Sequence, residues 1–140
     1  MSEVKKNVKE VLDSVKNVTV ATSLDCKPFC RVMQVQKVTE DLKIWFASYK
    51  NSPKVHQIEC IHDACIVASN EKTARDVRLF GKMETFSDLE SKKNIWQDEL
   101  KQFFPGGIDD PSFIVIVFSP EKIEFRDMKK GGLKPEEEVL

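Results

Sequence analysis

The sequence predicts a mainly β protein, a mostly antiparallel barrel with a few helices on its rim. Six or seven short runs rich in β-branched and aromatic residues recur along the 140 residues, together with three segments of helical periodicity. Several of these runs follow one another with only a tight turn between them. Neighbouring parallel strands need a crossover connection, so this spacing argues against a doubly wound parallel sheet and favours the barrel.

The first third of the chain is predicted to hold one helix and three strands. Apolar residues at helical spacing predict one buried stripe, formed by Val4, Val8, Val11, Leu12 and Val15. The period then changes to that of β structure. Strands are predicted at residues 18–22, 29–38 and 44–47, with turns at 25–28 and 40–41.

The middle of the chain begins with a second helix. Ser52 is a favoured N-cap residue, and Pro53 suits the first helical position. The inner face of this helix is predicted to carry Val55, Ile58 and, at its end, His62. Two further strands are predicted at residues 64–68 and 77–85.

The last third is predicted to hold one helix, two strands and a tail. Residues 87–90 resemble a capping box, and the helix that follows would carry Leu89, Trp96, Leu100 and Phe103 on one stripe and end at Pro105. The apolar run 113–118 predicts a strand buried on both faces, and residues 123–126 predict a last alternating strand. We expect one domain over residues 1–128 and a solvated or partner-held tail over 129–140.

Composition and charge exclude several classes of function. The chain has 22 Lys and Arg against 23 Asp and Glu, a net charge of -1 that gives no basic field for nucleic acid. No apolar run approaches the ~20 residues that span a bilayer, so no membrane partner is expected. The first residues show no signal-peptide pattern, so we expect a cytoplasmic protein. Its four cysteines, Cys26, Cys30, Cys60 and Cys65, are then expected to be thiols.

The corner at Ser52, Pro53 and Lys54 is a candidate phosphate site. A helix N-terminus offers unpaired N–H groups and a partial positive charge, Ser52 adds a hydroxyl, and Lys54 adds a full charge. Taken alone, the corner is more often a capped surface helix with a solvated lysine.

Arg31 is a second candidate because alternation places it on an apolar strand face with Phe29, Met33 and Val35. A charge on such a face needs a partner or an exit to solvent. An anionic ligand would serve, and so would a nearby carboxylate. From the sequence alone the ion pair is the commoner explanation.

Polar and aromatic residues on the neighbouring strands could line a site for a flat heterocycle. Gln34 and Gln36 project from the Arg31 strand on its other face and could hydrogen-bond such a ring. Trp45, Phe46 and Ser48 follow on the next strand. All five are equally ordinary as exposed strand or core residues.

The histidines and cysteines do not form a recognisable catalytic or metal-binding motif. The spacings of Cys26, Cys30, Cys60, His62 and Cys65 do not match paired zinc knuckles, so no metal is expected. Cys30 and Cys65 lie in β-rich runs and are expected to be small buried residues. Nucleotide-binding and hydrolase motifs are absent from the sequence, and no catalytic residue can be assigned.

An ordered set of short motifs carries a family resemblance. The motifs are residues 31–35, 43–48, 51–58 and 64–67, then Gly81 within 77–83, Trp96, the aromatic and glycine segment 103–107, residues 109–111 and the run 113–118. Over about residues 4–127 the chain resembles the pyridoxamine 5'-phosphate oxidase superfamily of FMN-binding split barrels. Within this superfamily it is most similar to the short general-stress flavin-binding proteins.

The resemblance implies a six-stranded antiparallel split β-barrel that forms a homodimer with FMN at the subunit interface. Carried over by position, Arg31 would contact the phosphate or ribityl chain, and Ser52 and Lys54 would hold the phosphate. The ring and ribityl part would lie along two strand segments, Val32, Met33 and Gln34 on one and Trp45, Phe46, Ala47 and Ser48 on the other.

The chain departs from the family pattern near its C-terminal end. Pyridoxamine phosphate oxidases carry an Arg-x-His element that helps hold the substrate, whereas here Arg126 is followed by Asp127 and Met128. We therefore expect an FMN-dependent oxidoreductase that acts on an unassigned small molecule, and not the vitamin B6 reaction. A flavin-binding protein or redox sensor without turnover remains an alternative. So does a split barrel that uses haem or deazaflavin, since His56 and His62 could serve haem.

Overall fold

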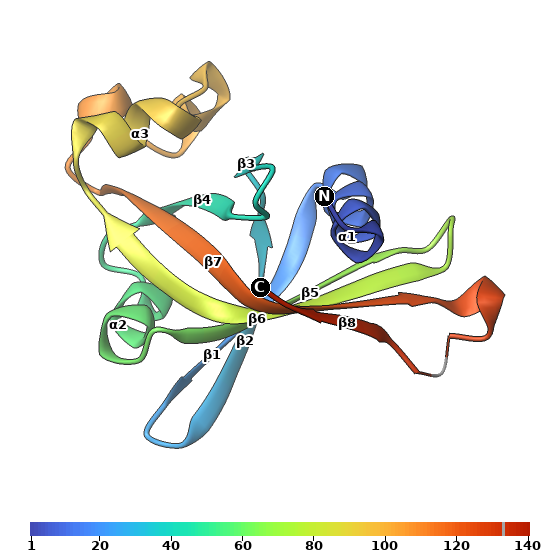
Figure 1. Ribbon diagram of the computed structural model, residues 1–140. Helices are drawn as coiled ribbons and strands as arrows, with labels where there is room; N and C mark the ends of the chain where they lie inside the picture. The colour runs from blue at the N-terminus through green and yellow to red at the C-terminus, as the bar shows by residue number, and fades with distance from the viewer. Residues whose placement is uncertain (133) are drawn as a thin grey trace.

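The chain folds into a strongly curved antiparallel sheet with helices packed around it (Figure 1). The computed structural model describes residues 1–132 and 134–140. In the sheet the strands follow the order β2-β1-β5-β6-β7-β4-β3, and β8 pairs with β7. The strands are β1 (Asn17–Leu24), β2 (Lys27–Gln34), β3 (Lys37–Val38), β4 (Ile44–Tyr49), β5 (Asp63–Asn70), β6 (Arg75–Phe86), β7 (Phe113–Asp127) and β8 (Glu136–Val139). The helices are α1 (Glu3–Ser14), α2 (Pro53–Cys60) and α3 (Leu89–Ile95), with 3-10 turns η1 (Asp98–Gln102), η2 (Gly107–Asp109) and η3 (Met128–Lys130).

This architecture confirms the predicted fold class, a mainly antiparallel split barrel with peripheral helices. The strand count differs from six because β3 and β8 are short additions. The runs 113–118 and 123–126, predicted as two strands, form the single long strand β7. Pro120 does not break it, since the β6 ladder shifts register between Phe80 and Gly81 and continues beyond.

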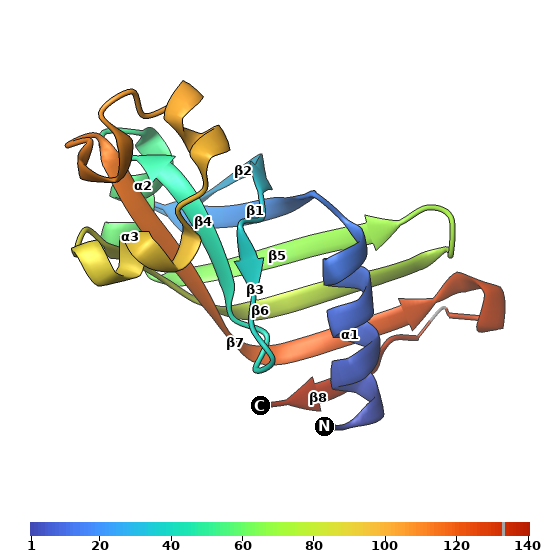
Figure 2. The same cartoon turned by 90° about the horizontal axis from the view of Figure 1, so that it is seen from above.

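The barrel is split where the chain leaves β2 for β3. The run 29–38 is predicted as one strand, but Val35 and Gln36 interrupt it. The Val35 amide donates to the Lys16 carbonyl at 2.9 Å, whereas the Gln36 amide donates to the Trp45 carbonyl at 2.9 Å. The chain therefore changes partner from the β1 side to β4. The two ends of the sheet order are consecutive in sequence, so the sheet curls back on itself (Figure 2).

The barrel core collects the alternate residues of each strand and the stripe of α1. Val8, Val11 and Leu12 are buried, as the helical spacing predicts. Helix α1 lies across β5, β6 and β7 (Figure 2). Within the described residues, no helix combines the length and the apolar character needed to cross a bilayer.

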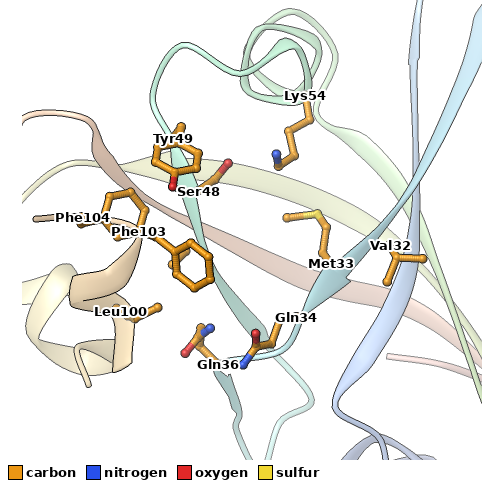
Figure 3. Close-up of a pocket in the computed structure, with 11 residues that line it drawn as sticks. Val32, Met33, Gln34, Gln36, Ser48, Tyr49, Lys54, Leu100, Phe103 and Phe104 are labelled. Atoms are coloured by element: carbon orange, nitrogen blue, oxygen red, sulfur yellow. The ribbon is translucent and has the colours of Figure 1, made fainter. Parts of the chain in front are cut away.

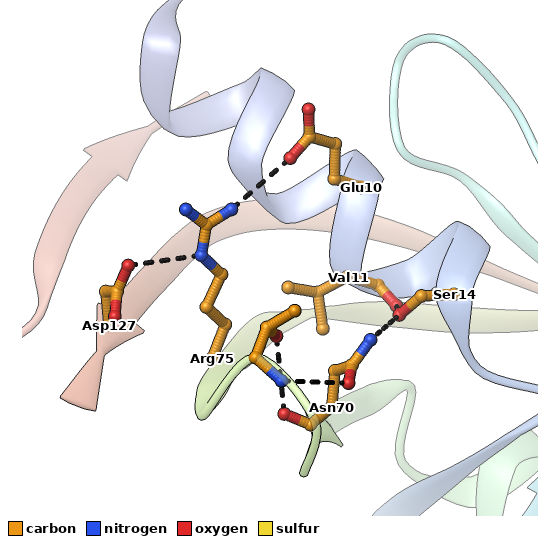
Figure 4. Close-up of polar contacts among 7 residues, drawn as sticks. Glu10, Val11, Ser14, Asn70, Arg75 and Asp127 are labelled. Carbon is orange, nitrogen blue, oxygen red and sulfur yellow. Dashed lines mark hydrogen bonds and ion pairs between the residues drawn. The ribbon is translucent and has the colours of Figure 1, made fainter. Parts of the chain in front are cut away.

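Polar contacts fix α1 to the neighbouring strand ends (Figure 4). The Asn70 amide donates to Ser14 Oγ at 2.9 Å. The Arg75 guanidinium lies 3.4 Å from a Glu10 oxygen and donates from Nε to Asp127 at 3.1 Å. The helix is thus attached both to the β5–β6 hairpin and to the end of β7.

A second, smaller core lies on the opposite face of β7. Phe113, Val115 and Val117 point into it, and Ile95, Leu100 and Phe104 cover them. The helix predicted from Leu89 to Phe103 is interrupted, because α3 ends at Ile95 and η1 begins at Asp98. The break allows Ile95 and Leu100 both to pack on β7. The N-cap is Asp88 and not Ser87, since Asp88 accepts the Ser91 amide at 3.0 Å.

Two chain segments differ from the sequence-based expectation at their ends. Helix α2 stops at Cys60, so His62 lies beyond it, where its Nδ1 is 3.2 Å from the Met83 carbonyl oxygen. In the tail expected to be solvated or partner-held, residues Glu136–Val139 form β8 against β7. Three of these four residues are nevertheless exposed.

Candidate functional site

A pocket of about 220 Å³ opens where the barrel is split (Figure 3). Strands β2 and β4 form two of its sides, α2 closes one end, and η1 with the loop after it forms the remaining wall. The lining residues are Val32, Met33, Gln34, Gln36, Ala47, Ser48, Tyr49, Lys54, Leu100, Phe103 and Phe104. Residues from four parts of the chain therefore meet at one place.

Six of the residues predicted for cofactor binding belong to this lining: Val32, Met33, Gln34, Ala47, Ser48 and Lys54. The other four, Arg31, Trp45, Phe46 and Ser52, lie beside it. Five lining residues were not among the predicted ligands: Gln36, Tyr49, Leu100, Phe103 and Phe104. Gln36 was weighed as a possible ring contact, but the η1 wall depends on packing that no local pattern reveals.

Arg31 sits on the inner face of β2, opposite Val20 of β1. Its Nη1 donates to the Val20 carbonyl at 3.1 Å and its Nη2 donates to Gln57 Oε1 at 2.7 Å. Burial lowers the pKa of the guanidinium from its ordinary value. Within the described residues no carboxylate pairs with Arg31, so the ion pair weighed from sequence is not formed.

Lys54 extends from the first turn of α2 with its ammonium group pointing into the pocket (Figure 3). Burial, and then the nearby positive charge of Arg31, lower the pKa of Lys54. No ion pair holds it within the described part of the chain. Two partly buried cations therefore lie close together at one end of the pocket without an acidic partner, which is an unfavourable arrangement unless an anion joins them.

The hydroxyl groups of Ser48 and Ser52 lie side by side at the same end of the pocket. Ser52 occupies the N-cap position of α2, as predicted, but its side chain makes no capping hydrogen bond. Its Oγ lies instead 3.3 Å from Ser48 Oγ. Two hydroxyls, two cations and a helix N-terminus thus converge at this end.

Trp45 and Phe46 occupy places that limit their contact with any ligand. Phe46 is 0% exposed within the barrel core, so only its backbone can face the pocket. Trp45 packs against the second core. The Trp45 Nε1–H is buried and has no hydrogen-bond partner among the described residues.

An aromatic wall stands across the pocket from β2 (Figure 3). The rings of Tyr49 and Phe104 make a tilted contact at 4.9 Å between centroids, and the Phe104 ring lies 4.7 Å from that of Phe113 in the second core. Phe103 is 47% exposed at the mouth. The loop that follows is fixed by Asp110, which accepts the Ser112 hydroxyl at 2.7 Å and the Gly106 amide at 2.9 Å. These bonds, that of the Ser112 side chain first, lower the pKa of Asp110.

The pocket thus offers a cationic end, an aromatic wall and a strand edge. Such a set suits a ligand with an anionic group at one end and a flat ring at the other. A family model described as pyridoxamine 5'-phosphate oxidase-like matches residues 3–136. The chain belongs to the pyridoxamine 5'-phosphate oxidase-like family.

Solved structures of low sequence identity share the fold of this family member. A Clostridium acetobutylicum protein related to general stress protein 26 has 22% identity and a TM-score of 0.84, covering 99% of this chain and 95% of its own. An FMN-binding, pyridoxamine 5'-phosphate oxidase-related protein of Nostoc punctiforme has 13% identity and a TM-score of 0.78, covering 100% and 97%. A haem-binding protein of Mycobacterium smegmatis has 14% identity and a TM-score of 0.76, covering 99% and 59%. Among curated proteins, none matches the sequence.

The histidines and cysteines of this oxidase-like chain lie outside the pocket lining. His56 is exposed, with Cys60 Sγ 3.8 Å from its Nε2, and His62 contacts the Met83 carbonyl. Within residues 1–132 and 134–140, no three His, Cys, Asp or Glu side chains are grouped to hold a metal ion. Cys30 is exposed and Cys65 is half-buried, so the expectation that both are buried is wrong. They lie on the outer face of the sheet, opposite the barrel core.

Proposed function

We propose that this protein binds FMN in the pocket at the split of the barrel. The phosphate would lie between Arg31, Lys54 and the hydroxyl of Ser52, and the ring would lie against the aromatic wall. The observation that carries the proposal is the pair of partly buried cations without a carboxylate partner among the described residues. A phosphate dianion would provide the missing counter-charge.

The edge of β2 supports the position of the ring. Strand β2 ends the sheet order and pairs through its backbone with β1 on one side. Its other edge, at Val32, Met33 and Gln34, can therefore offer main-chain N–H and C=O groups to the polar edge of a flavin. The amide side chains of Gln34 and Gln36 add further donors and acceptors.

We further propose that a second copy of the chain completes the site. A volume of about 220 Å³ is small against the ~300–1,000 Å³ typical of ligand pockets. The outer face of β2, β1, β5 and β6 next to it exposes apolar side chains, with Thr19 and the Arg78–Glu124 ion pair between them. The apolar residues of this outer sheet face are Cys30, Val32, Ala21, Cys65, Val67 and Phe80. Val32, 66% exposed, belongs both to this face and to the pocket.

The reaction we propose is an oxidation or reduction of a small molecule. Bound FMN would supply hydride or electron transfer, and the protein would hold the cofactor and keep water from it. Arg126 supports a substrate other than pyridoxamine phosphate, because it is paired with Asp76 at 2.8 Å and does not line the pocket. Among the described residues, none that lines the pocket is Asp, Glu, His or Cys, which keeps flavin binding without turnover as a second candidate.

The experiment that tests FMN binding is the visible absorption spectrum of the purified protein, before and after adding FMN and removing the excess. We expect a flavin spectrum in the wild-type protein and its loss in the double variant Arg31→Ala, Lys54→Ala, with folding retained because neither residue belongs to the apolar core. A Soret-type spectrum, or wild-type protein that takes up no FMN, would contradict the proposal. NAD(P)H oxidation above background with added acceptors then separates the oxidoreductase from the carrier or sensor.

Cytoplasmic localisation stays a prediction. The four cysteines are all unpaired in the structure, which is the state that a reducing compartment maintains.

A further inference from the structure

We propose that Gln57 is a positioning residue, which holds the Arg31 guanidinium toward an anionic ligand while leaving its charge unneutralised. The inference rests on the proposed function and deepens it, because it names the device that prepares the site for a phosphate group. Gln57 does not line the pocket and would not touch the ligand.

Gln57 joins three elements beneath the cationic end of the pocket. It lies on α2, one turn after Lys54, and is 6% exposed. Its Oε1 accepts from Arg31 Nη2 of β2 at 2.7 Å and from Thr22 Oγ1 of β1 at 2.7 Å. One helix therefore supplies both a direct cation, Lys54, and the acceptor that fixes the second cation.

The donors around Gln57 determine how its amide is turned. A guanidinium can only donate, so the atom facing Arg31 must be the amide oxygen and not the nitrogen. With Nη1 held by the Val20 carbonyl and Nη2 by Gln57, two N–H groups of Arg31 are used. The remaining N–H groups have no partner among the described residues, which leaves donors for the proposed anionic ligand.

The other arginines show that a neutral partner is unusual in this chain. Arg75 pairs with Asp127 at 3.1 Å, Arg78 with Glu124 at 3.0 Å and Arg126 with Asp76 at 2.8 Å. Within the described residues, Arg31 is the one arginine whose side-chain partner is an amide. A carboxylate at residue 57 could make the same contact but would cancel the charge that attracts the ligand.

An ion pair would both orient the Arg31 guanidinium and neutralise its charge, whereas Gln57 does only the first. Gln57 fixes the direction of the guanidinium, as a glutamate would, and it leaves the local charge of Arg31 and Lys54 intact, as a glutamate would not. A structural hydrogen bond alone would require only the first property. The variant Gln57→Glu changes the second property while keeping the shape and the acceptor.

The test compares the affinities of Gln57→Glu for FMN and for riboflavin, which carries the same ring without the phosphate. We expect FMN to bind roughly 10- to 100-fold more weakly than to wild type, the range of a charge-assisted hydrogen bond, and riboflavin to change by less than about threefold. The thermal midpoint of the ligand-free variant should be equal or higher, since the introduced carboxylate forms an ion pair with Arg31. The matched control is Gln102→Glu, the same change at an exposed residue outside the lining.

Each outcome has a distinct meaning. The positioning role would be overturned if Gln57→Glu lost FMN and riboflavin affinity equally, or if its FMN affinity were unchanged. Either result would leave standing the proposal that the wild-type protein binds FMN. If Gln57→Glu does not fold, the preference of Gln57→Ala for FMN over riboflavin decides. Loss of the positioned Arg31 charge should lower this preference, whereas a general loosening of the site should weaken both flavins equally. Wild-type protein that binds neither flavin would overturn the proposed function and this inference with it.

Discussion

The partly buried positive charge of Lys54 destabilises the ligand-free fold. Its ammonium group is partly buried and close to Arg31, and both effects lower its pKa. The unfolded chain therefore holds the Lys54 proton more tightly than the folded protein does. As the pH rises from the lowered pKa to the ordinary lysine value, the free energy of unfolding increases by this contribution.

Replacing Lys54 should accordingly strengthen the ligand-free fold and weaken the site. Lys54→Met removes the charge and keeps an unbranched side chain of similar length. We expect the thermal midpoint at pH 7 to rise by about 1–3 °C and FMN affinity to fall at least about tenfold. Differential scanning calorimetry and flavin titration measure the two effects. A lower midpoint in ligand-free Lys54→Met would show that the charge is not strained, and Lys50→Met, at an exposed turn, is the control.

Short sequence patterns predicted some of the individual site residues. Ser52 and Lys54 were found because a serine, a proline and a lysine in a row mark a helix start beside a charge. Gln57 was missed because its importance depends on Arg31 and Thr22 reaching it from two strands. The spacing of one turn after Lys54 was the available signal, and it is also what an ordinary helix face shows.

Strands β6 and β7 approach each other closely at Gly81. A Cβ atom there would lie 2.1 Å from the Ser119 carbonyl oxygen and 2.9 Å from Pro120 Cα. The ladder between β6 and β7 shifts register at the same place, between Phe80 and Gly81. The absence of a side chain thus allows the long strands to bend together.

Gly81→Ala should therefore destabilise the fold without touching the pocket. The methyl group must push two backbones apart, which typically costs about 1–3 kcal/mol. Urea denaturation should show the loss as a lower midpoint. Lys82→Ala, at the next and exposed position of β6, should stay within about 1 kcal/mol of wild type, because it removes only a surface ion pair with Asp63. Equal stability of Gly81→Ala and wild type would show that the close approach can relax.

The sequence predicted the type of most helices and strands correctly, but it predicted less well where each one ends. The alternating and apolar runs predicted all six long strands, because burial on one or both faces leaves a clear pattern. The single helix predicted from Leu89 to Phe103 is wrong at Trp96, because α3 ends at Ile95 and the separate 3-10 turn η1 begins at Asp98. The division of residues 29–38 between two partner strands also follows from tertiary contacts at Val35 and Gln36.

The outer sheet face leaves apolar side chains exposed at the surface of the molecule. Val32, Val67 and Phe80 are exposed there beside two cysteines, and the face runs into the pocket at Val32. Exposed apolar side chains gathered on one sheet face mark an interaction site more often than a free surface. In the proposed dimer, a second copy of the chain would both bury this face and enclose the proposed flavin.

If the proposed dimer forms, disrupting this face should separate its subunits and weaken FMN binding. We expect wild-type protein to sediment at about twice the mass of one chain, and Val67→Glu to sediment as a monomer with at least about tenfold weaker FMN binding. Met128→Glu, an equally exposed apolar residue at the β7–β8 connection, should change neither property. A wild-type monomer that binds FMN normally would contradict the shared site.

At the scale of the molecule, the sequence predicts the architecture more firmly than the assembly. Strand pairs joined by tight turns argue against a doubly wound parallel sheet, and the structure confirms the antiparallel split barrel. The homodimer remains a prediction from the family resemblance, because an outward Val67 and an inward Ile66 look alike in a run of apolar residues. Only the register against β1 and β6 assigns each to its face.

Strand β7 has a consequence for how this protein could acquire a different ligand. Ile114, Ile116 and Phe118 belong to the barrel, whereas Phe113, Val115 and Val117 support the aromatic wall. The barrel core and the second core therefore pack on opposite faces of the same strand, and they should unfold as a single cooperative unit. Substitutions that reshape the aromatic wall for a larger or smaller ring would therefore also disturb packing in the barrel core, through β7. Changes of specificity should come more readily from Gln34, Gln36 and Phe103, whose side chains can vary without disturbing either interior.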